Sequence, residues 1–238
     1  MERRAVMSVS YSILCAGDFP TVPQVRDALL FSDIVVCCDG AVSALLPFRT
    51  PDYVVGDMDS CPDGLKQILA DKVITVSEQE SNDLSKAFRF VCSHSGIDRN
   101  AAADGLSVTV YGASGKREDH AVGNMSLMAD FAWYLRERNA GVPLVMLSDY
   151  GMTVPLTGSC RLRLPEGQPV SVFAFDPSLR LRSKGLEYPT DGVCFDMWWK
   201  ATLNRVAAEE VELEMSVPAK MLLYLPGLYD RELEVTRI

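Results

Sequence analysis

Residues 53–61, YVVGDMDSC, join a run of strand-forming residues to a glycine and two aspartates, Asp57 and Asp59. A short apolar run rich in valine and bounded by glycine is typical of a strand buried inside a sheet. Two carboxylates this close repel each other unless a cation lies between them or one of them is protonated. Taken alone, the stretch also fits a turn before a capped helix, with Ser60 and Asp63 resembling a capping box.

Strand-like runs alternate with helical patterns through the first 150 residues. Continuous apolar strands separated by helices predict a mostly parallel sheet flanked by helices on both faces. Thr21 is a candidate N-cap for the first helix, because threonine is favoured at that position. The predicted strands are 8–17, 33–40, 52–57, 72–77, 107–112 and 142–148, and the predicted helices are 21–32, 41–46, 62–70, 82–96 and 119–138.

The pattern changes after about residue 150, where helical signals stop. Short segments with frequent alternation, punctuated by proline and glycine, predict an all-β sandwich. The predicted strands are 161–164, 170–175, 196–203, 210–215, 220–225 and 231–238. Trp198 and Trp199 are adjacent and would point to opposite faces of such a strand, so at least one could be a core residue. The predicted domains are therefore an α/β domain over 1–150 and a β-sandwich over 151–238.

Composition limits the class of protein. The chain has 238 residues, 48% of them apolar, and a net charge of −9, which argues against a nucleic-acid-binding protein. Its seven cysteines include no CxxC pair and mostly lie in apolar runs, which favours reduced thiols and a cytoplasmic location. No run approaches the ~18 apolar residues of a membrane span. Serines alternate with apolar residues over 8–13, which favours a strand over a signal peptide.

Ligands of an open parallel sheet bind beyond the carboxyl ends of its strands. The predicted strand-end loops are 15–20, 38–41, 56–61, 77–83 and 112–120, and they bring several aspartates to one edge: Asp39, Asp57, Asp59, Asp83 and Asp119. Each loop alone has a structural explanation, such as a turn at Asp39-Gly40 or an N-cap within 81–83. Aspartates in several of these loops together are harder to explain as caps and predict a site for Mg²⁺, which prefers oxygen ligands.

The loop GASGKREDH at 112–120 carries the features of a phosphate site. Gly112 and Gly115 let backbone N–H groups approach an anion just before a helix begins, while Lys116 and Arg117 add positive charge. The spacing matches neither a Walker A loop nor GxGxxG, and a mobile surface turn is the alternative. His120 could act as a general base, orient Asp119 or be structural. Asn124 lies one helical turn further on the same face.

The ordered motifs D-G (39–40), G-D-x-D-S (56–60), Q-x-x-N-D-x-x-K-A (79–87) and G-x-x-G-x-R-x-D-H-x-x-x-N (112–124) together resemble thiamine pyrophosphokinases, and GLEYP (185–189) fits their β half. The resemblance spans nearly the whole chain. It implies a homodimer in which an N-terminal domain binds ATP and a C-terminal sandwich helps to hold thiamine. It also implies transfer of the diphosphate of ATP to the thiamine hydroxyl, which gives thiamine diphosphate and AMP.

The resemblance implies a role for each matching residue. Catalysis falls to Asp57, Asp59, Asp83, Arg117 and Asp119, and the first three of these would hold Mg²⁺. Tyr188 would lie near thiamine, whose thiazolium cation and flat pyrimidine suit an aromatic face, and otherwise it fits a sandwich core; Asn204 would also contact thiamine. Nucleotide binding falls to Gly17, Asp18, Asp39, Gly40, Gln79, Asn82, Lys86, Gly112, Gly115, His120 and Asn124. Lys86 could instead be a solvated surface lysine.

The chain departs from the family pattern at four positions and leaves two other functions open. Ala41, Asn82, Lys116 and Leu203 stand where the family often has glycine, threonine, glycine and serine. One alternative is a phosphatase with a D-x-D motif and Asp57 as its nucleophile, although this explains neither Asp39 nor the 112–120 loop. The other is a nucleotide-binding regulator without turnover, which the intact carboxylates and Arg117 disfavour.

Overall fold

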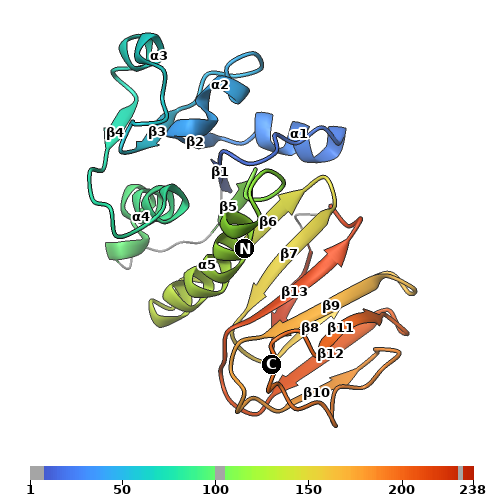
Figure 1. The fold of residues 1–238 in the computed structure, drawn as a ribbon. Coiled ribbons are helices and arrows are strands. Elements are labelled where there is room, and N and C mark those ends of the chain that lie inside the picture. Colours follow the sequence, from blue (N-terminus) through green and yellow to red (C-terminus); the bar gives the residue numbers. More distant parts are fainter. Residues whose placement is uncertain (1–7, 100–104, 230–232) are drawn as a thin grey trace, which may run out of the picture. The chain divides into compact units, whose positions relative to one another are not determined.

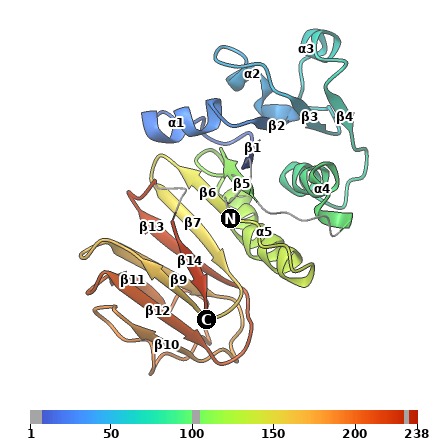
Figure 2. The ribbon, with the colours of Figure 1, turned by 180° about the vertical axis from the view of Figure 1, so that it is seen from behind.

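A computed structural model describes residues 8–99, 105–229 and 233–238. The chain forms two compact units (Figures 1 and 2). The first contains the described residues of Met1–Leu127 together with Tyr134–Asp149, and the second contains Met128–Trp133 and the described residues of Tyr150–Ile238. Among the described residues, no helix is both long and apolar enough to cross a membrane.

Six strands of the first unit form an all-parallel sheet in the order β6-β5-β1-β2-β3-β4. The central strands are buried, as the continuous apolar runs predict. The parallel sheet confirms the fold class expected for this part of the chain. The strands are β1 (Val9–Leu14), β2 (Ile34–Cys38), β3 (Tyr53–Gly56), β4 (Val73–Thr75), β5 (Leu106–Tyr111) and β6 (Leu144–Ser148).

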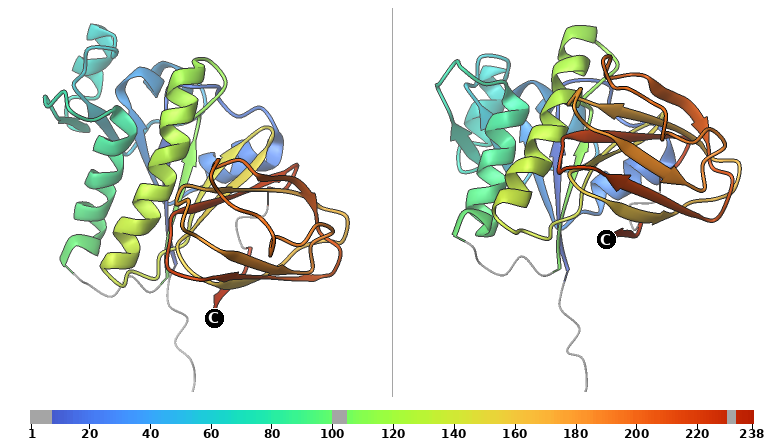
Figure 3. Two further views of the ribbon diagram at one scale, coloured as in Figure 1. Left: turned by 60° about the horizontal axis from the view of Figure 1, so that its bottom comes forward. Right: turned by 90° about the horizontal axis from the view of Figure 1, so that it is seen from below.

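Helices cover both faces of this sheet. The connections from β1 through β2 and β3 to β4 run in one direction along the sheet, whereas those from β4 to β5 and from β5 to β6 run in the other direction. Because each crossover is right-handed, the helices of these two groups of connections lie on opposite faces of the sheet. Figure 3 shows α4 and α5 together on one side and α1 on the other. The helices are α1 (Pro23–Leu30), α2 (Val42–Leu45), α3 (Asp63–Ile68), α4 (Asp83–Ser95) and α5 (Glu118–Glu137), with 3₁₀ turns η1 (Asp39–Ala41) and η2 (Ile97–Arg99).

The start of α1 differs from the expected N-cap at Thr21. The helix begins at Pro23, its N-cap residue is Val22, and no side chain caps it. Thr21 instead donates its hydroxyl to Asp149 Oδ2 at 2.6 Å, and the backbone N–H groups of Thr21 and Val22 donate to the same carboxylate. The prediction was wrong because a carboxylate 128 residues away in the chain satisfies the donors that a local cap would serve.

The order of the strands fixes where a ligand can bind. The chain leaves β1 in one direction along the sheet and β5 in the other, although these strands are neighbours. A crevice forms beyond the carboxyl ends of two strands at such a reversal. The loops that leave β1 and β5 are those containing Gly17 and Gly112, so the sheet places the predicted phosphate loop at this point.

Two antiparallel sheets make up the second unit, with strand orders β11-β9-β13-β7 and β10-β12-β8-β14. Alternating burial along β8 and β12 shows that each strand turns one face to the core. This all-β architecture confirms the expected fold class. The strands are β7 (Gly151–Leu156), β8 (Cys160–Arg163), β9 (Pro169–Ala174), β10 (Leu181–Lys184), β11 (Ala201–Arg205), β12 (Glu210–Met215), β13 (Met221–Pro226) and β14 (Val235–Arg237).

The tryptophan pair does not lie on a strand. β11 begins at Ala201, and Trp198 and Trp199 occupy the turn before it, both about half exposed. Trp198 packs beside Phe173 and Phe175, with ring centroids 5.4 and 6.0 Å away. The expected strand over 196–203 was therefore wrong in its first half, and neither tryptophan is a core residue.

All seven cysteines lie in the described residues and are free. Six of them are buried, and Cys194 is exposed. Burial raises the pKa of Cys92 and of Cys160 to about 12, so both thiols stay protonated at neutral pH. The buried cysteines therefore act as small apolar core residues, as their sequence surroundings predict.

Replacing Ile13 with alanine should lower the free energy of unfolding by about 2–5 kcal/mol, because the side chain is fully buried in the central strand β1 and its loss leaves a cavity. Chemical denaturation measures the change. Ile68→Ala is the matched control, since Ile68 is 72% exposed on α3 and the same truncation there should change stability by less than about 0.5 kcal/mol. Equal losses in the two variants would contradict the assignment of β1 to the core.

Candidate active site

Asp39 is a buried carboxylate at the carboxyl end of β2. It is 1% exposed, and its oxygens accept hydrogen bonds from the backbone N–H groups of Gly40 at 2.6 Å and Ser60 at 3.4 Å. Gly56 makes room for it, because a Cβ atom at that position would lie 2.8 Å from Asp39 Cγ. Asp39 therefore connects the end of β2 to the loop after β3, and its negative charge raises the pKa of Asp83.

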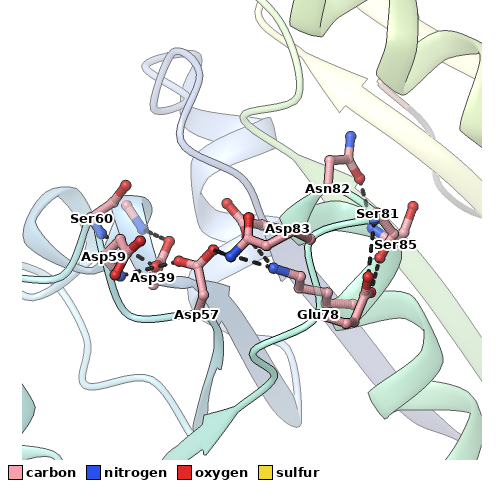
Figure 4. A network of polar contacts seen from close by, with 12 residues as sticks. Asp39, Asp57, Asp59, Ser60, Glu78, Ser81, Asn82, Asp83 and Ser85 are labelled. Carbon is pink, nitrogen blue, oxygen red and sulfur yellow. Dashed lines mark hydrogen bonds and ion pairs between the residues drawn. The ribbon is translucent and has the colours of Figure 1, made fainter.

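Asp57 and Asp59 follow β3 and are separated by a residue in an unusual conformation. Met58 has φ of 70° and is 7% exposed, so a buried non-glycine residue adopts the left-handed region. This bend lets Asp57 Oδ1 accept the backbone N–H of Asp59 at 3.1 Å. Figure 4 shows Asp39, Asp57 and Asp59 close together on this side of the site. The expected capping box is absent, since Pro62 is the N-cap residue of α3 and no side chain caps it.

The Lys86 ammonium lies between Asp57 and Asp83. Its Nζ is 3.4 Å from Asp57 Oδ2 and 3.8 Å from Asp83 Oδ1, and the lysine side chain is only 2% exposed. A buried ammonium is stable only beside negative charge, and neighbouring carboxylates repel each other less with a cation between them. Lys86 is therefore an internal counter-ion of the carboxylate group, and the alternative of a solvated surface lysine is wrong.

The pKa values of Asp57 and Asp83 are shifted in opposite directions. Hydrogen bonds from the Asp59 backbone and the Gln79 amide, together with Lys86, hold the pKa of Asp57 below its usual range. Burial raises the pKa of Asp83, and the charges of Asp39 and Asp57 raise it further, while Lys86 opposes them. Asp83 is therefore the carboxyl group whose ionised form is disfavoured by its surroundings.

The donor chemistry of this group suits a divalent cation. Its ligand atoms are carboxylate oxygens on consecutive strand ends, which Mg²⁺ prefers. Among the described residues, no three histidine, cysteine, aspartate or glutamate side chains lie close enough together to form a ready metal site. Lys86 supplies the positive charge between Asp57 and Asp83 in this arrangement. The residues thus fit Mg²⁺ by chemistry, and the assignment of Asp57, Asp59 and Asp83 as its ligands stays a prediction.

Glu78 organises the loop between β4 and α4, and the sequence did not single it out. Its Oε2 accepts the backbone N–H groups of Glu80 at 2.8 Å and Ser81 at 3.1 Å, while Oε1 contacts the Ser81 hydroxyl and Arg89 Nη1. The neighbouring Gln79 then donates its Nε2 to Asp57 Oδ2 at 3.1 Å. An acidic residue with short polar residues three and four positions later in a loop, here Ser81 and Asn82, is the signal that could have identified this turn.

The glycine loop packs tightly against the loop that follows β1. Gly17 N–H donates to the carbonyl of Gly112 at 2.7 Å, and a Cβ at Gly17 would lie 2.3 Å from the Ser114 carbonyl oxygen. Gly115 has φ of 103°, and a Cβ there would meet the Asp18 carboxylate at 2.0 Å. Glycine is thus required at these positions for the two loops to approach, whether or not a phosphate is bound.

Charged side chains surround the glycine loop. Arg117 donates to Asp119 at 2.5 Å, and both side chains are 64% exposed. The hydrogen bond from Arg117 holds the pKa of Asp119 below its usual range, which weakens Asp119 as a proton acceptor. Lys116 Nζ donates to the carbonyl of Ala16 at 3.0 Å. His120 is exposed in the first turn of α5, and its positive charge would lower the pKa of both Asp83 and Asp119.

The amides of Asn82 and Asn124 bond to each other. Asn82 is the N-cap of α4, where its side chain accepts the Ser85 N–H, so the N-cap expected within 81–83 is confirmed. Its Nδ2 donates to Asn124 Oδ1 at 3.0 Å. The structure therefore brings these two predicted nucleotide-binding residues together, with part of their hydrogen-bonding capacity already used within the protein.

In the second unit, Asn204 holds the backbone of Tyr188. Asn204 Nδ2 donates to the Tyr188 carbonyl at 2.7 Å, and its Oδ1 accepts the Tyr188 N–H at 3.1 Å. Asn204 is 6% exposed, whereas the Tyr188 side chain is 60% exposed. The core alternative for Tyr188 is therefore wrong. Leu203, beside Asn204, has φ of 60° and is 88% exposed at an irregularity of β11.

Comparison with solved structures finds the same fold in proteins of low sequence identity. The thiamin pyrophosphokinase of Candida albicans matches with a TM-score of 0.72 and 16% identity, covering 95% of this chain and 94% of its own. The yeast enzyme matches with a TM-score of 0.76 and 12% identity over 94% and 88%. That of Bacillus subtilis matches with 0.69 and 14% over 91% and 98%. No curated protein sequence matches the chain.

Family models identify both parts of the chain. Residues 25–139 match the catalytic domain of thiamin pyrophosphokinase. Residues 151–224 match the substrate-binding domain of the same family. These two matches follow each other in the chain and together cover most of it, and the structural neighbours share the fold over nearly the full length. The chain therefore belongs to the thiamin pyrophosphokinase family.

Proposed function

We propose that this enzyme transfers the diphosphate group of ATP to the hydroxyl of thiamine, releasing AMP, at the sheet edge described above. The observation that carries the proposal is the juxtaposition of Asp57 and Asp83 about the buried Lys86, at the same edge of the sheet as the strand-order reversal that presents the glycine loop. A phosphate chain with a divalent cation complements both features, since the cation suits the carboxylates and the anion suits the loop.

Asp57, Asp59 and Asp83 are the residues that would hold Mg²⁺. When bound, the ion would supply positive charge that neutralises the charge developing on the phosphates during transfer. The raised pKa of Asp83 supports this role, because a carboxylate destabilised by burial and by like charges gains most from a cation. Gln79 would keep Asp57 oriented through its amide hydrogen bond.

Arg117 would stabilise the transferring diphosphate. Its guanidinium is exposed and pairs with the exposed Asp119 through Nε and one Nη, which leaves further N–H groups to bind phosphate oxygens. The backbone N–H groups of the glycine loop would add uncharged donors. We assign Asp119 the role of orienting Arg117, because its lowered pKa makes it a weak general base. Transfer of this kind depends mainly on positioning and electrostatics.

Tyr188 is the proposed thiamine contact in the second unit. Its exposed ring suits the thiazolium cation, and Asn204 would act on thiamine indirectly by fixing the Tyr188 backbone. The direct contact of Asn204 with thiamine and the homodimer, both implied by the resemblance, stay predictions, as does the cytoplasmic location that the cysteines favour.

Incubating the protein with ATP, Mg²⁺ and thiamine should yield thiamine diphosphate and AMP, which mass spectrometry distinguishes from other products. ADP with thiamine monophosphate would contradict diphosphate transfer. Phosphate release that does not require thiamine would favour the D-x-D phosphatase, and tight ATP binding without any product would favour the regulator.

Asp57→Asn and Asp59→Asn should each lower kcat by at least about 100-fold, since each removes a charged ligand of the proposed cation. Circular dichroism should show the fold intact. Asp63→Asn is the matched control, because the Asp63 side chain is 92% exposed and pairs only with Lys66, so this variant should keep wild-type activity. Near-normal activity of either site variant would refute the role given to that carboxylate.

Asp83→Asn should stabilise the metal-free protein at neutral pH. The folded-state pKa of Asp83 is raised, so its ionised form opposes folding above that pKa, and the asparagine removes this penalty. The gain should shrink as the pH falls through the folded-state pKa and vanish below the unfolded value, where both states of the wild-type residue are protonated. Thermal unfolding at several pH values measures it.

Two comparisons make the Asp83 result decisive. Asp63→Asn should show no such pH-dependent gain, because Asp63 is exposed. Wild-type protein should gain stability when Mg²⁺ and ATP are added together, and Asp83→Asn should gain less. A destabilised Asp83→Asn variant at neutral pH would show that the pairing with Lys86 outweighs burial and repulsion.

A further inference from the structure

Two asparagine side chains connect the carboxylate side of the site to the glycine loop. The Ser85 N–H donates to Asn82 Oδ1 at 3.0 Å, Asn82 Nδ2 donates to Asn124 Oδ1 at 3.0 Å, and Asn124 Nδ2 donates to the carbonyl of Ala113 at 2.8 Å. We call Asn82 and Asn124 the amide relay. It runs from the first turn of α4, through the first half of α5, to the loop that follows β5.

The relay can be satisfied in one orientation only. Each asparagine side chain offers an oxygen that accepts and a nitrogen that donates. At one end the Ser85 N–H can only donate, and at the other the Ala113 carbonyl can only accept. Turning over either amide would set like atoms against each other at two contacts. The two ends are therefore held at one separation by three directed hydrogen bonds.

Burial of Asn124 makes the inner part of the relay difficult to replace with water. Asn124 is 6% exposed, whereas Asn82 is exposed, and among the described residues no buried side-chain nitrogen or oxygen lacks a hydrogen-bond partner. Breaking the Asn82–Asn124 bond would leave the Asn124 oxygen without this donor in a largely enclosed position. Such unpaired buried groups are unfavourable, so the surrounding loops would shift to restore a partner.

The two ends of the relay lie beside the carboxylates and the glycine loop, the two groups proposed to bind a phosphate chain and its cation. Asn82 directly precedes Asp83, which shares Lys86 with Asp57. Ala113 directly follows Gly112, whose φ of 60° bends the loop. A displacement at Ala113 would therefore move the loop N–H donors relative to the carboxylates.

We propose that Asn82 and Asn124 are positioning residues that set the distance between the glycine loop and the carboxylates Asp57 and Asp83. This inference rests on the proposed function, in which the loop holds the phosphates of ATP and the carboxylates hold its cation. Threonine can also cap a helix through its hydroxyl, but it has no N–H group to offer Asn124. Asparagine carries a separate amide nitrogen for Asn124 beside the oxygen that caps the helix, whereas threonine has one hydroxyl for both contacts.

Asn82→Thr separates the two tasks of Asn82. The variant keeps an acceptor for the Ser85 N–H and adds no charge, but it removes the amide nitrogen that donates to Asn124 and leaves a single shorter hydroxyl for both contacts. Hydrogen–deuterium exchange of the free protein should show faster exchange of the backbone amides of 112–117, about 10-fold or more, with α4 protected as in the wild type. Asn124→Ala should give the same effect. Ser126→Ala is the control on α5, where the residue is exposed, and should leave exchange in 112–117 unchanged.

Kinetics of the same variants test the consequence for the reaction. kcat should fall about 10-fold or more in Asn82→Thr and in Asn124→Ala, because a misplaced phosphate loses the aligned geometry for transfer. The double variant should lose no more than either single one, since both break the same connection. Asn124→Ser provides a milder variant should Asn124→Ala fail to fold.

The outcomes separate this inference from the proposed function. If the wild type makes no thiamine diphosphate, the proposed function fails, while the exchange experiment still decides whether the relay holds the loop. Unchanged exchange in 112–117, or multiplicative losses of kcat in the double variant, would overturn the relay. A raised KM for ATP with unchanged kcat and unchanged exchange would show that the asparagines contact the nucleotide directly instead.

Discussion

The site depends on the ion pairs that the ammonium group of Lys86 forms with Asp57 and Asp83. Parallel strands deliver Asp39, Asp57 and Asp83 to one edge of the sheet because each strand ends where the chain turns into a polar loop. Nothing in the strand geometry keeps these carboxylates apart. A lysine from the second turn of α4, buried almost completely, supplies the positive charge that lets them remain together before any ligand binds. The same helix begins with Asp83, so one element provides both the charge and its partner.

Lys86 does not balance the two carboxylates beside it equally. Asp57 is stabilised as an anion by two hydrogen bonds and by Lys86, whereas burial and its neighbours disfavour the charged form of Asp83. A site in which every carboxylate were fully paired would gain little from a metal. The proposed cation would therefore act mainly on Asp83, whose ionised form the surrounding protein disfavours.

The fold class and most strands of the first unit could be predicted because buried parallel strands produce continuous apolar runs. The second unit was harder. β7 lies at Gly151–Leu156 and was missed, since Pro155 interrupts its pattern and proline usually argues against a paired strand. The segment around Trp198 and Trp199 looked like a strand because aromatic residues favour one, yet these residues form a turn. Aromatic propensity reports a preference for a packed surface, which a turn beside Phe173 and Phe175 also supplies.

The site could be predicted as a set of residues but not as a set of contacts. Aspartates after successive strands are visible in the sequence, whereas the bonds of Asn82 to Asn124, or of Thr21 to Asp149, join residues that only the folded chain brings together. The same limit explains why Glu78 was overlooked: its role depends on which backbone N–H groups face it.

Position 58 has two structural requirements that few residues meet together, a left-handed backbone and a buried apolar side chain. Its backbone has the left-handed φ that glycine adopts most easily, while its side chain is buried and fills space beneath the loop. Glycine would relieve the backbone and leave a void, asparagine would suit the backbone and bury a polar group, and valine or isoleucine would suit the burial but not the backbone. Few residues satisfy both conditions, so the range of sequences open to the D-x-D turn is narrowed by the packing beneath it as well as by the chemistry of its aspartates.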